Sequence, residues 1–410
     1  MSARLLLVVL VPLANFSAAQ VSDPTNRGAV DGFDLKSEPV VVWKYVSPKR
    51  KNFQQKEVPI GLSDVCIADG VVYVGDDLGE LRAFRSRDGK KLWERKHGER
   101  IYSSPVSDGS RVYIGTEKGI EAIDCKNGDG IWKKDIRGTG GLALWPPKPP
   151  TKGKLQMLFV GSDDGMLNAF ITRTGTKRWS ESMMFEVPDD PEGFDSKRAR
   201  IGEAKARPRG IATDGKMIFQ GIFDQSRVVA MSAAGGDTKW SFATKGWVGA
   251  APTVDRDRVF VGSQDKRVYC VNRNTGEKIW EFATRGRISS AAAVRGNKVF
   301  ASSSAGHMHC LNRETGKELW SFRTDADKTG RRFIYCEPIV TEDTIYFAVG
   351  CGLVYALDTE DGQLRWKFRP LPDSQIYSSI VTDGERLFIT TRPDWDGKGD
   401  AALIAIGPSP

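Results

Sequence analysis

The chain has 410 residues, a formal net charge of +8, 40% hydrophobic residues and 27% charged residues. This composition excludes a membrane-helix bundle and a disordered chain, while the length allows either several domains or one large repeat array. Most lysines and arginines alternate with acidic residues along the chain, so we expect a solvated surface of mixed charge and no nucleic-acid site.

Residues 1–19 have the pattern of a secretory signal peptide. Arg4 precedes an apolar run from Leu5 to Phe16, and the small residues that follow fit a cleavage site. We expect cleavage after about Ala19, an N-terminal linker over residues 20–38, and a periplasmic or secreted protein. No cysteine follows the apolar run and no later stretch is long and apolar, so we expect neither a lipid anchor nor an integral membrane segment.

One motif recurs seven times along the chain. In every copy a small residue stands ten positions before a tryptophan and a glycine stands four positions before it. Ala122 to Trp132 and Ala356 to Trp366 share the skeleton A-x-D-x-x-x-G-x-x-x-W. The seven tryptophans are Trp93, Trp132, Trp179, Trp240, Trp280, Trp320 and Trp366.

Each copy lies in a unit that predicts four short strands, with alternating β-branched and aromatic residues between glycine-containing turns. Such units, repeated every 39 to 61 residues, predict an all-β propeller of four-stranded blades. After Trp366 the chain has three more strands and no fourth, whereas Val40 to Tyr45, which contains Trp43, resembles the tryptophan strand. We therefore predict one eight-bladed domain over residues 40–407, closed by this N-terminal strand, and a tail at 408–410.

The motif resembles the tryptophan-docking repeat of the PQQ-type (quinoprotein) β-propeller family over nearly all of residues 40–407. Length and blade number are similar to those of the BamB branch, the scaffolds of outer-membrane assembly. The resemblance implies an exported, non-catalytic scaffold or ligand-binding propeller, whose partner is an envelope protein or a small anionic ligand. The alternative is a small quinoprotein-type oxidoreductase that binds PQQ with calcium in the propeller channel. We expect a monomer with no cofactor and no catalytic residue.

The eight tryptophans, Trp43 included, are interpreted as packing between blades. Trp145 and Trp247 lie outside the repeat and are candidate surface anchors, with local loop packing as the alternative. Residues that begin the inner strands line the channel of a propeller, where aromatic and cationic side chains would suit an anionic ligand. The candidate channel and partner surface comprises Tyr102, Trp145, Arg209, Trp247, Arg287, Arg331, Arg332, Tyr335, Glu337 and Tyr377.

The longest break in the repeat is an insertion at residues 181–210, where an acidic stretch precedes a basic cluster. The two either grip a charged partner or pair with each other. His307 and His309 share one strand face, but no third ligand is apparent, so we expect no metal site. Cys336 and Cys351 are expected at one end of the same blade and are the candidate disulfide.

Overall fold

The computed structural model describes residues 29–52, 55–101, 103–136, 138–148, 155–183, 208–326, 330, 332–394 and 397–409. These ranges contain strands and no helix, and therefore no helix long and apolar enough to cross a membrane. The predicted signal peptide, residues 184–207 of the predicted insertion, Tyr102 and Arg331 lie outside the described residues.

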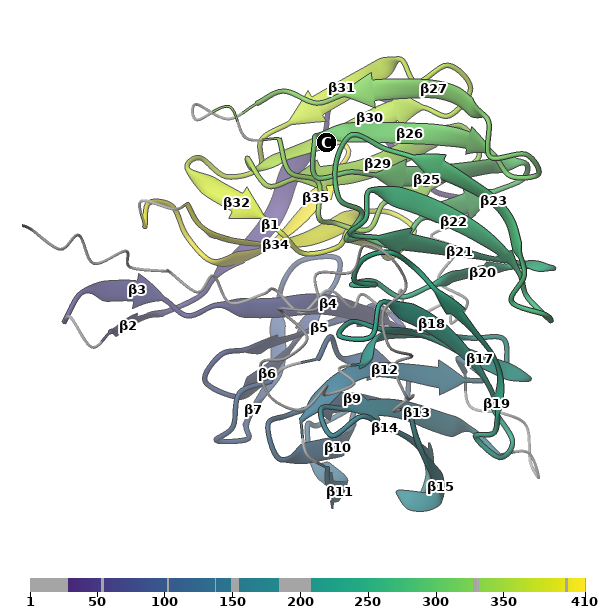
Figure 1. Ribbon diagram of the computed structural model, residues 1–410. Coiled ribbons are helices and arrows are strands. Elements are labelled where there is room, and N and C mark those ends of the chain that lie inside the picture. Colours follow the sequence, from purple (N-terminus) through teal and green to yellow (C-terminus); the bar gives the residue numbers. More distant parts are fainter. Residues whose placement is uncertain are drawn as a thin grey trace, which may run out of the picture.

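The strands form eight sheets arranged around a ring, which confirms the predicted propeller (Figure 1). Blades 1 to 4 comprise β4 (Leu62–Ala68), β5 (Val71–Asp76), β6 (Glu80–Arg85) and β7 (Lys91–Lys96); β8 (Val106–Ser107), β9 (Arg111–Gly115), β10 (Gly119–Asp124) and β11 (Gly130–Asp135); β12 (Thr139–Trp145), β13 (Met157–Ser162), β14 (Met166–Ile171) and β15 (Thr176–Ser182); β16 (Pro208–Thr213), β17 (Met217–Ile222), β18 (Arg227–Ser232) and β19 (Thr238–Ala243).

Blades 5 to 7 comprise β20 (Thr253–Asp255), β21 (Arg258–Ser263), β22 (Arg267–Asn272) and β23 (Lys278–Ala283); β24 (Ala293–Arg295), β25 (Lys298–Ser302), β26 (His307–Asn312) and β27 (Glu318–Arg323); β28 (Ile339–Val340), β29 (Thr344–Val349), β30 (Leu353–Asp358) and β31 (Leu364–Phe368). Blade 8 comprises β33 (Val381–Thr382), β34 (Leu387–Pro393), β35 (Ala402–Gly407) and β1 (Val40–Val46), with β32 (Ser374–Ile376) also paired to β34. The short hairpin of β2 (Lys49–Lys51) and β3 (Glu57–Pro59) connects β1 to blade 1.

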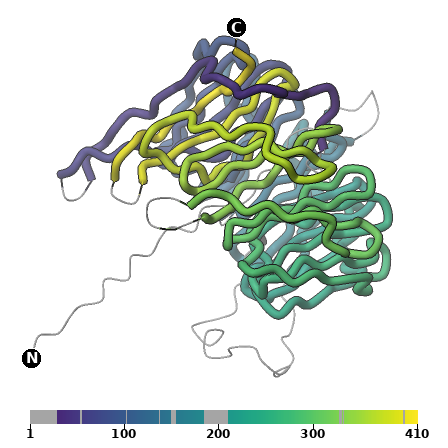
Figure 2. Tube along the Cα trace, turned by 90° about the horizontal axis from the view of Figure 1, so that it is seen from above, coloured from purple at the N-terminus to yellow at the C-terminus, as the bar shows by residue number. Residues whose placement is uncertain are grey.

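Strand β1 and the last strand, β35, meet in blade 8, as the sequence predicts. Strand β1 pairs antiparallel with β35, and Trp43 lies opposite Ala405. Figure 2 shows the purple N-terminal strand beside the yellow C-terminal strands. Strand β1 is therefore the outer strand of the last blade, and its pairing with β35 closes the ring.

The hydrophobic core is divided into eight clusters, and each cluster spans two neighbouring blades. The cluster at the closure joins Val65 and Phe84 of blade 1 to Phe388 and Leu403 of blade 8. Because each sheet is apolar on both faces, no blade buries its core alone, and stability depends on contact between neighbours.

Each of the eight repeat tryptophans lies at such an interface. Its indole N–H donates to a backbone carbonyl oxygen over 2.6–3.2 Å, which for Trp43 through Trp320 belongs to the next blade. Its ring also lies 5.7–6.0 Å, between centroids, from a tyrosine or phenylalanine on the second strand of its own blade. The tryptophans thus hold neighbouring blades together.

The repeat glycine is required by the tryptophan of the preceding blade. Gly276 has a φ of +74°, and a Cβ there would lie 2.7 Å from the ring of Trp240. The same contact joins Gly89 to Trp43 across the closure of the ring. Within one repeat, the glycine therefore contacts the preceding blade and the tryptophan contacts the following blade. Their fixed spacing in the sequence reflects these two interfaces, one on each side of a blade.

Trp366 docks differently. In blade 8 the two outer strands, β35 and β1, come from separate parts of the sequence, so they are not joined by the turn that receives the tryptophan in the other blades. The Trp366 indole donates to the carbonyl oxygen of Leu35 over 2.7 Å. Phe33 and Leu35 are buried in the cluster between blades 7 and 8, and the Leu35 amide donates to the Tyr346 hydroxyl. These residues fall in the segment that the sequence suggested as a linker, and they fill the last docking position.

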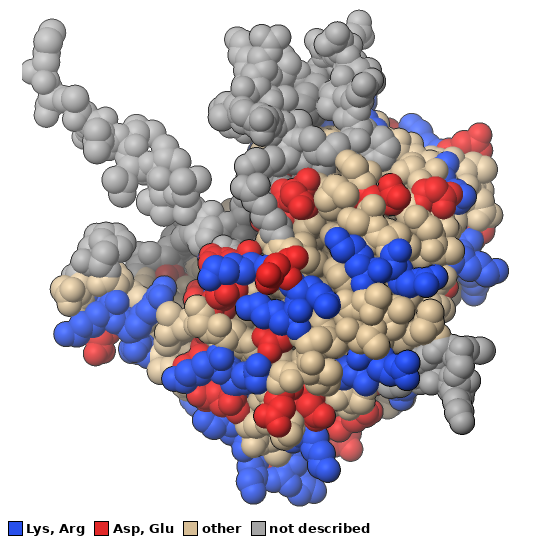
Figure 3. Space-filling view, turned by 90° about the horizontal axis from the view of Figure 1, so that it is seen from below, with Lys and Arg blue, Asp and Glu red and all other residues tan. Residues whose placement is uncertain are grey.

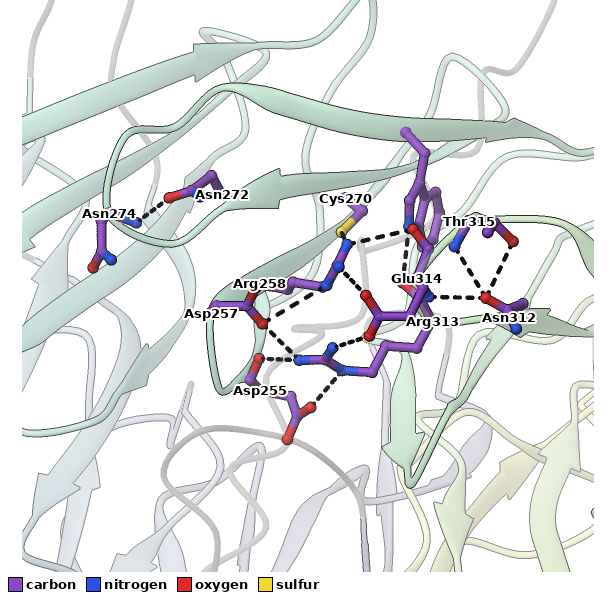
Figure 4. A network of polar contacts seen from close by, with 11 residues as sticks. Asp255, Asp257, Arg258, Cys270, Asn272, Asn274, Asn312, Arg313, Glu314 and Thr315 are labelled. Carbon is purple, nitrogen blue, oxygen red and sulfur yellow. Dashed lines mark hydrogen bonds and ion pairs between the residues drawn. The ribbon is translucent and has the colours of Figure 1, made fainter.

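Ion pairs reinforce the interface between blades 5 and 6 (Figure 4). Arg313, whose carbonyl accepts the indole hydrogen bond of Trp280, donates from its guanidinium to Asp255 over 2.7 Å and to Asp257 over 3.0 Å. Arg258 of blade 5 pairs in the opposite direction with Glu314 of blade 6. These reciprocal ion pairs fix the two turns around the docked indole.

A pair of glycine-to-alanine substitutions separates tryptophan docking from backbone strain. Gly276→Ala and Gly296→Ala both place a Cβ at positive φ, but around Gly296 the Cβ would meet no atom within 4 Å. We expect Gly296→Ala to lower the free energy of unfolding by about 1–2 kcal/mol. Gly276→Ala should cost ~1–3 kcal/mol more, because the Trp240 ring must move. Equilibrium urea unfolding measures both, and equal costs would contradict the docking role.

Candidate functional site

Aromatic side chains before the inner strands of blades 7 and 8 form a stack with one arginine. The ring centroids of Phe333 and Tyr335 are 5.5 Å apart, and those of Tyr335 and Tyr377 are 5.7 Å apart, with the planes nearly parallel. The guanidinium carbon of Arg392, on β34, lies 3.5 Å from the Tyr377 centroid. All four residues keep partial solvent exposure. We call this surface the mouth stack.

Below the mouth stack, the inner strands place eight equivalent residues around the axis. In every blade one inner-strand residue pairs with the aromatic residue that contacts the blade's tryptophan, as Val106 pairs with Tyr113. Two positions earlier stands a residue that we assign to an inner ring. The inner ring comprises Asp64, Ser104, Gly141, Gly210, Ala251, Ala291, Glu337 and Ser379.

Neighbouring members of the inner ring contact one another. The Ser104 hydroxyl donates to Asp64 over 3.1 Å, and the backbone amide of Glu337 donates to the Ser379 hydroxyl over 3.4 Å. A Cβ added to Gly141 would lie 3.2 Å from the backbone nitrogen of Gly210. These contacts show that the strands converge closely, which is why most positions hold glycine, alanine or serine.

Two members of the inner ring are carboxylates, on either side of Ser379. Burial raises the pKa of Glu337 to about 8, and the negative charge of Asp64 adds to the rise. Burial likewise raises the pKa of Asp64 to about 7, against the hydrogen bonds from Ser104 and from the backbone of Ser379. Among the described residues, no lysine or arginine shifts either value. Near neutral pH the pair therefore binds protons that isolated carboxyl groups would release.

Glu337 is the least satisfied polar group at the axis. It is 5% exposed, and neither carboxylate oxygen has a hydrogen-bond partner among the described residues. The Ala291 backbone lowers its pKa without reaching hydrogen-bond geometry. Asp64, although enclosed by protein, remains partly exposed to solvent. A buried acceptor without a donor is costly, so this position marks a candidate binding site.

The structure brings together only some of the predicted surface residues. Tyr335 and Tyr377 belong to the mouth stack. Burial raises the pKa of Tyr335, and Arg287 lies close enough to oppose that rise. Glu337 lies in the inner ring. Arg332 is turned toward the backbone, where its guanidinium donates to the carbonyl of Thr324 over 3.1 Å. The inner ring thus holds two acidic residues, Asp64 and Glu337, and no basic one.

The remaining predicted positions lie elsewhere. Trp247 packs against Phe223, with centroids 4.6 Å apart. Trp145 ends β12 and packs between blades 3 and 4, where a Cβ on Gly215 would collide with its ring. For Trp145 the structure thus shows the alternative interpretation, local packing. Arg209 belongs to β16, and its side chain is not among those described.

The histidine and cysteine pairs also have structural explanations. The rings of His307 and His309 are stacked 5.7 Å apart, and His309 contacts Glu318 over 2.7 Å. No disulfide joins Cys336 to Cys351, so the candidate disulfide is wrong. The two thiols face opposite sides of blade 7: Cys336 lies in the cluster toward blade 8, and Cys351 packs on the cluster toward blade 6.

The surface away from the axis shows no dominant charge on the face seen in Figure 3, where basic and acidic side chains are interspersed.

Sequence reasoning missed three residues of the site: Asp64, Phe333 and Arg392. Aligning Cys66 with Val106 through their pairing to the second strand would have identified Asp64, but blade 1 lacks the serine pair that makes the alignment visible in blades 2 and 8.

Comparison with known proteins supports the fold and its family. A family model described as "Outer membrane protein assembly factor BamB" matches residues 40–187 and 163–334. The BamB of Xanthomonas campestris is 26% identical over 136 residues, which are 30% of this chain and 31% of that protein. A quinohemoprotein alcohol dehydrogenase of Comamonas testosteroni is 26% identical over 142 residues, covering 30% of this chain and 20% of the relative. The matched segments thus span less than a third of these relatives.

The solved structure of BamB from Moraxella catarrhalis superposes with a TM-score of 0.61 at 15% identity. It covers 89% of this chain and 100% of that structure, so the likeness extends over the whole ring and concerns the fold alone.

The raised pKa values predict a pH dependence of stability. A folded-state pKa above the unfolded value stabilises the fold below the unfolded pKa, and this stabilisation is lost as pH rises through the folded pKa. The free energy of unfolding of the parent should therefore fall between pH 5 and about 8. In Glu337→Gln the fall should be smaller by about 2–4 kcal/mol. Urea unfolding across this pH range tests it, with exposed Glu360→Gln as the control. Parallel curves for parent and Glu337→Gln would refute the assignment.

Proposed function

The chain belongs to the BamB-type branch of the PQQ-like β-propeller family, and on that premise we propose that it is an exported, non-catalytic scaffold that binds an envelope protein. The proposed partner surface is the mouth stack, with Arg287 beside it. The names of the BamB relatives connect them to outer-membrane assembly, and we extend that process to this protein as part of the proposal.

The observation that carries this proposal is the continuous, partly exposed stack of Phe333, Tyr335, Tyr377 and Arg392. Large rigid aromatic residues and arginine dominate the binding energy of protein interfaces, because they bury much area at little cost in conformational entropy. The stack is already ordered by its internal contacts, so little further ordering is needed when a partner binds.

A second candidate is an oxidoreductase that uses PQQ, favoured by the similarity to quinohemoprotein alcohol dehydrogenase. PQQ is a tricarboxylate, and it would meet two carboxylates in the inner ring. Within the described residues, no cluster of three histidine, cysteine, aspartate or glutamate side chains is placed to hold a bridging metal ion. The inner ring therefore does not fit this cofactor, and we favour the scaffold.

Capture of partners from envelope extract tests the proposal. The parent protein should recover components of outer-membrane assembly, identified by mass spectrometry. Tyr335→Ala should reduce their recovery at least about tenfold, because the middle ring of the stack is lost. Tyr377→Phe keeps the ring and serves as the matched control, and thermal unfolding checks that both variants are folded.

Unchanged recovery with Tyr335→Ala would exclude the mouth stack as the partner surface. The enzymatic alternative has a separate measurement: PQQ and calcium chloride are added to the protein, and dye-coupled oxidation of alcohols is followed. Saturable turnover would overturn the scaffold proposal.

A further inference from the structure

The inner ring contains acceptors that nothing described in the protein satisfies. Both oxygens of Glu337 lack a hydrogen-bond partner among the described residues, although the residue is 5% exposed. Asp64, two blades away, receives one hydrogen bond from the Ser104 hydroxyl and one from the backbone of Ser379. An ionised carboxylate only accepts hydrogen bonds, so a ligand that completes this site must be rich in donors.

We propose that the inner ring binds an organic cation, a primary ammonium or guanidinium group, between Glu337 and Asp64. An ammonium carries three donors and a guanidinium carries five, and each brings the positive charge that the described surroundings of the two carboxylates lack. The site does not depend on the scaffold function, because the carboxylates lie below the mouth stack and belong to a separate set of side chains.

Small residues occupy the part of the inner ring opposite the two carboxylates. At the four positions from Gly141 to Ala291, the ring residues are glycine or alanine, so no long side chain extends from them toward the axis. Asp64 keeps partial solvent exposure even though protein surrounds it. The serines at 104 and 379 flank Asp64 and add hydroxyl groups beside the carboxylates.

The donor set favours an organic cation over a metal ion or an anion. Calcium takes six to eight oxygen ligands and zinc about four, whereas the inner ring offers two carboxylates. The described residues provide no third acidic, histidine or cysteine side chain at metal-binding distance. An anion would face two like charges at close range, which raises its energy steeply in a buried site.

Binding of the cation is coupled to release of a proton. Among the described residues, the charge that acts on Glu337 is that of Asp64. Burial and then Asp64 raise the pKa of the Cys336 thiol, which stays neutral, while Arg287 and Arg392 act one layer above on Tyr335. Because burial raises the pKa of Glu337 to about 8, the cation displaces a proton at neutral pH. Affinity should therefore rise with pH, by up to about tenfold per pH unit between pH 7 and 8, where the pair holds about one proton.

Calorimetric titration of the purified protein with agmatine, which carries one guanidinium and one ammonium group, tests this inference at pH 8. We expect saturable binding of one molecule per chain. Glu337→Gln and Asp64→Asn should each weaken it by about 30-fold or more, since each removes a buried charge partner. The exposed Glu360→Gln makes the same charge change at an outer turn and should leave affinity unchanged. At pH 7, two buffers of different ionisation enthalpy should reveal proton release.

A parallel titration uses a tripeptide with blocked, uncharged termini and one central lysine. The same peptide with acetyl-lysine, which has no charge, is the control. Binding of the lysine peptide alone would identify a protein side chain as the source of the cation, and binding of agmatine alone would identify a free amine; both support the site. Absence of saturable binding, or binding unaffected by either inner-ring variant, would overturn it. Binding of calcium chloride that is lost in Glu337→Gln, without amine binding, would also overturn it. None of these outcomes depends on partner capture.

Discussion

The structure depends on one interaction repeated around the ring: the tryptophan on the outer strand of a blade contacts the turn of the next blade, and for Trp366 the segment at Leu35 takes the place of that turn. The indole N–H satisfies a carbonyl there, and the ring packs where a glycine at positive φ leaves no side chain. Because the core is divided among blade interfaces, this contact sets both the spacing of the blades and the position of their inner strands. Trp43 makes the same contact across the closure, with the carbonyl of Ser86 in blade 1, while its own strand pairs with β35 at the other end of the domain.

The inner ring is a consequence of that spacing. Blades held at one distance bring one residue of each inner strand to the axis, where neighbouring backbones nearly touch, as between Gly141 and Gly210. Small residues are required at most of these positions, so the carboxylates of Asp64 and Glu337 are departures from the rule. Their raised pKa values follow from the enclosure that the packing creates. The fold thus sets the electrostatics of the site, while the choice of residue supplies its chemistry.

Blade number, repeat register and closure could be predicted from sequence, because each tryptophan and glycine records a local contact that recurs. Glu337 was also found, since it begins a recognisable inner strand. Asp64 was missed because β4 lacks the serine pair that marks the equivalent position in blades 2 and 8. Leu35 was missed because no strand periodicity marks a segment that only fills a docking position. The disulfide failed because sequence spacing placed both cysteines on one blade without showing that their side chains face opposite sides.

Native-state hydrogen exchange on Trp43→Ala tests the central claim, that tryptophan docking closes the ring. If it does, amides of blade 8 and blade 1 should lose protection together, by the same free energy, while those of blades 3 to 5 keep theirs under native conditions. The interface that Trp43 occupies joins only those two blades directly. Protection that is unchanged at both sides of the closure, or lost equally in every blade, would contradict the account.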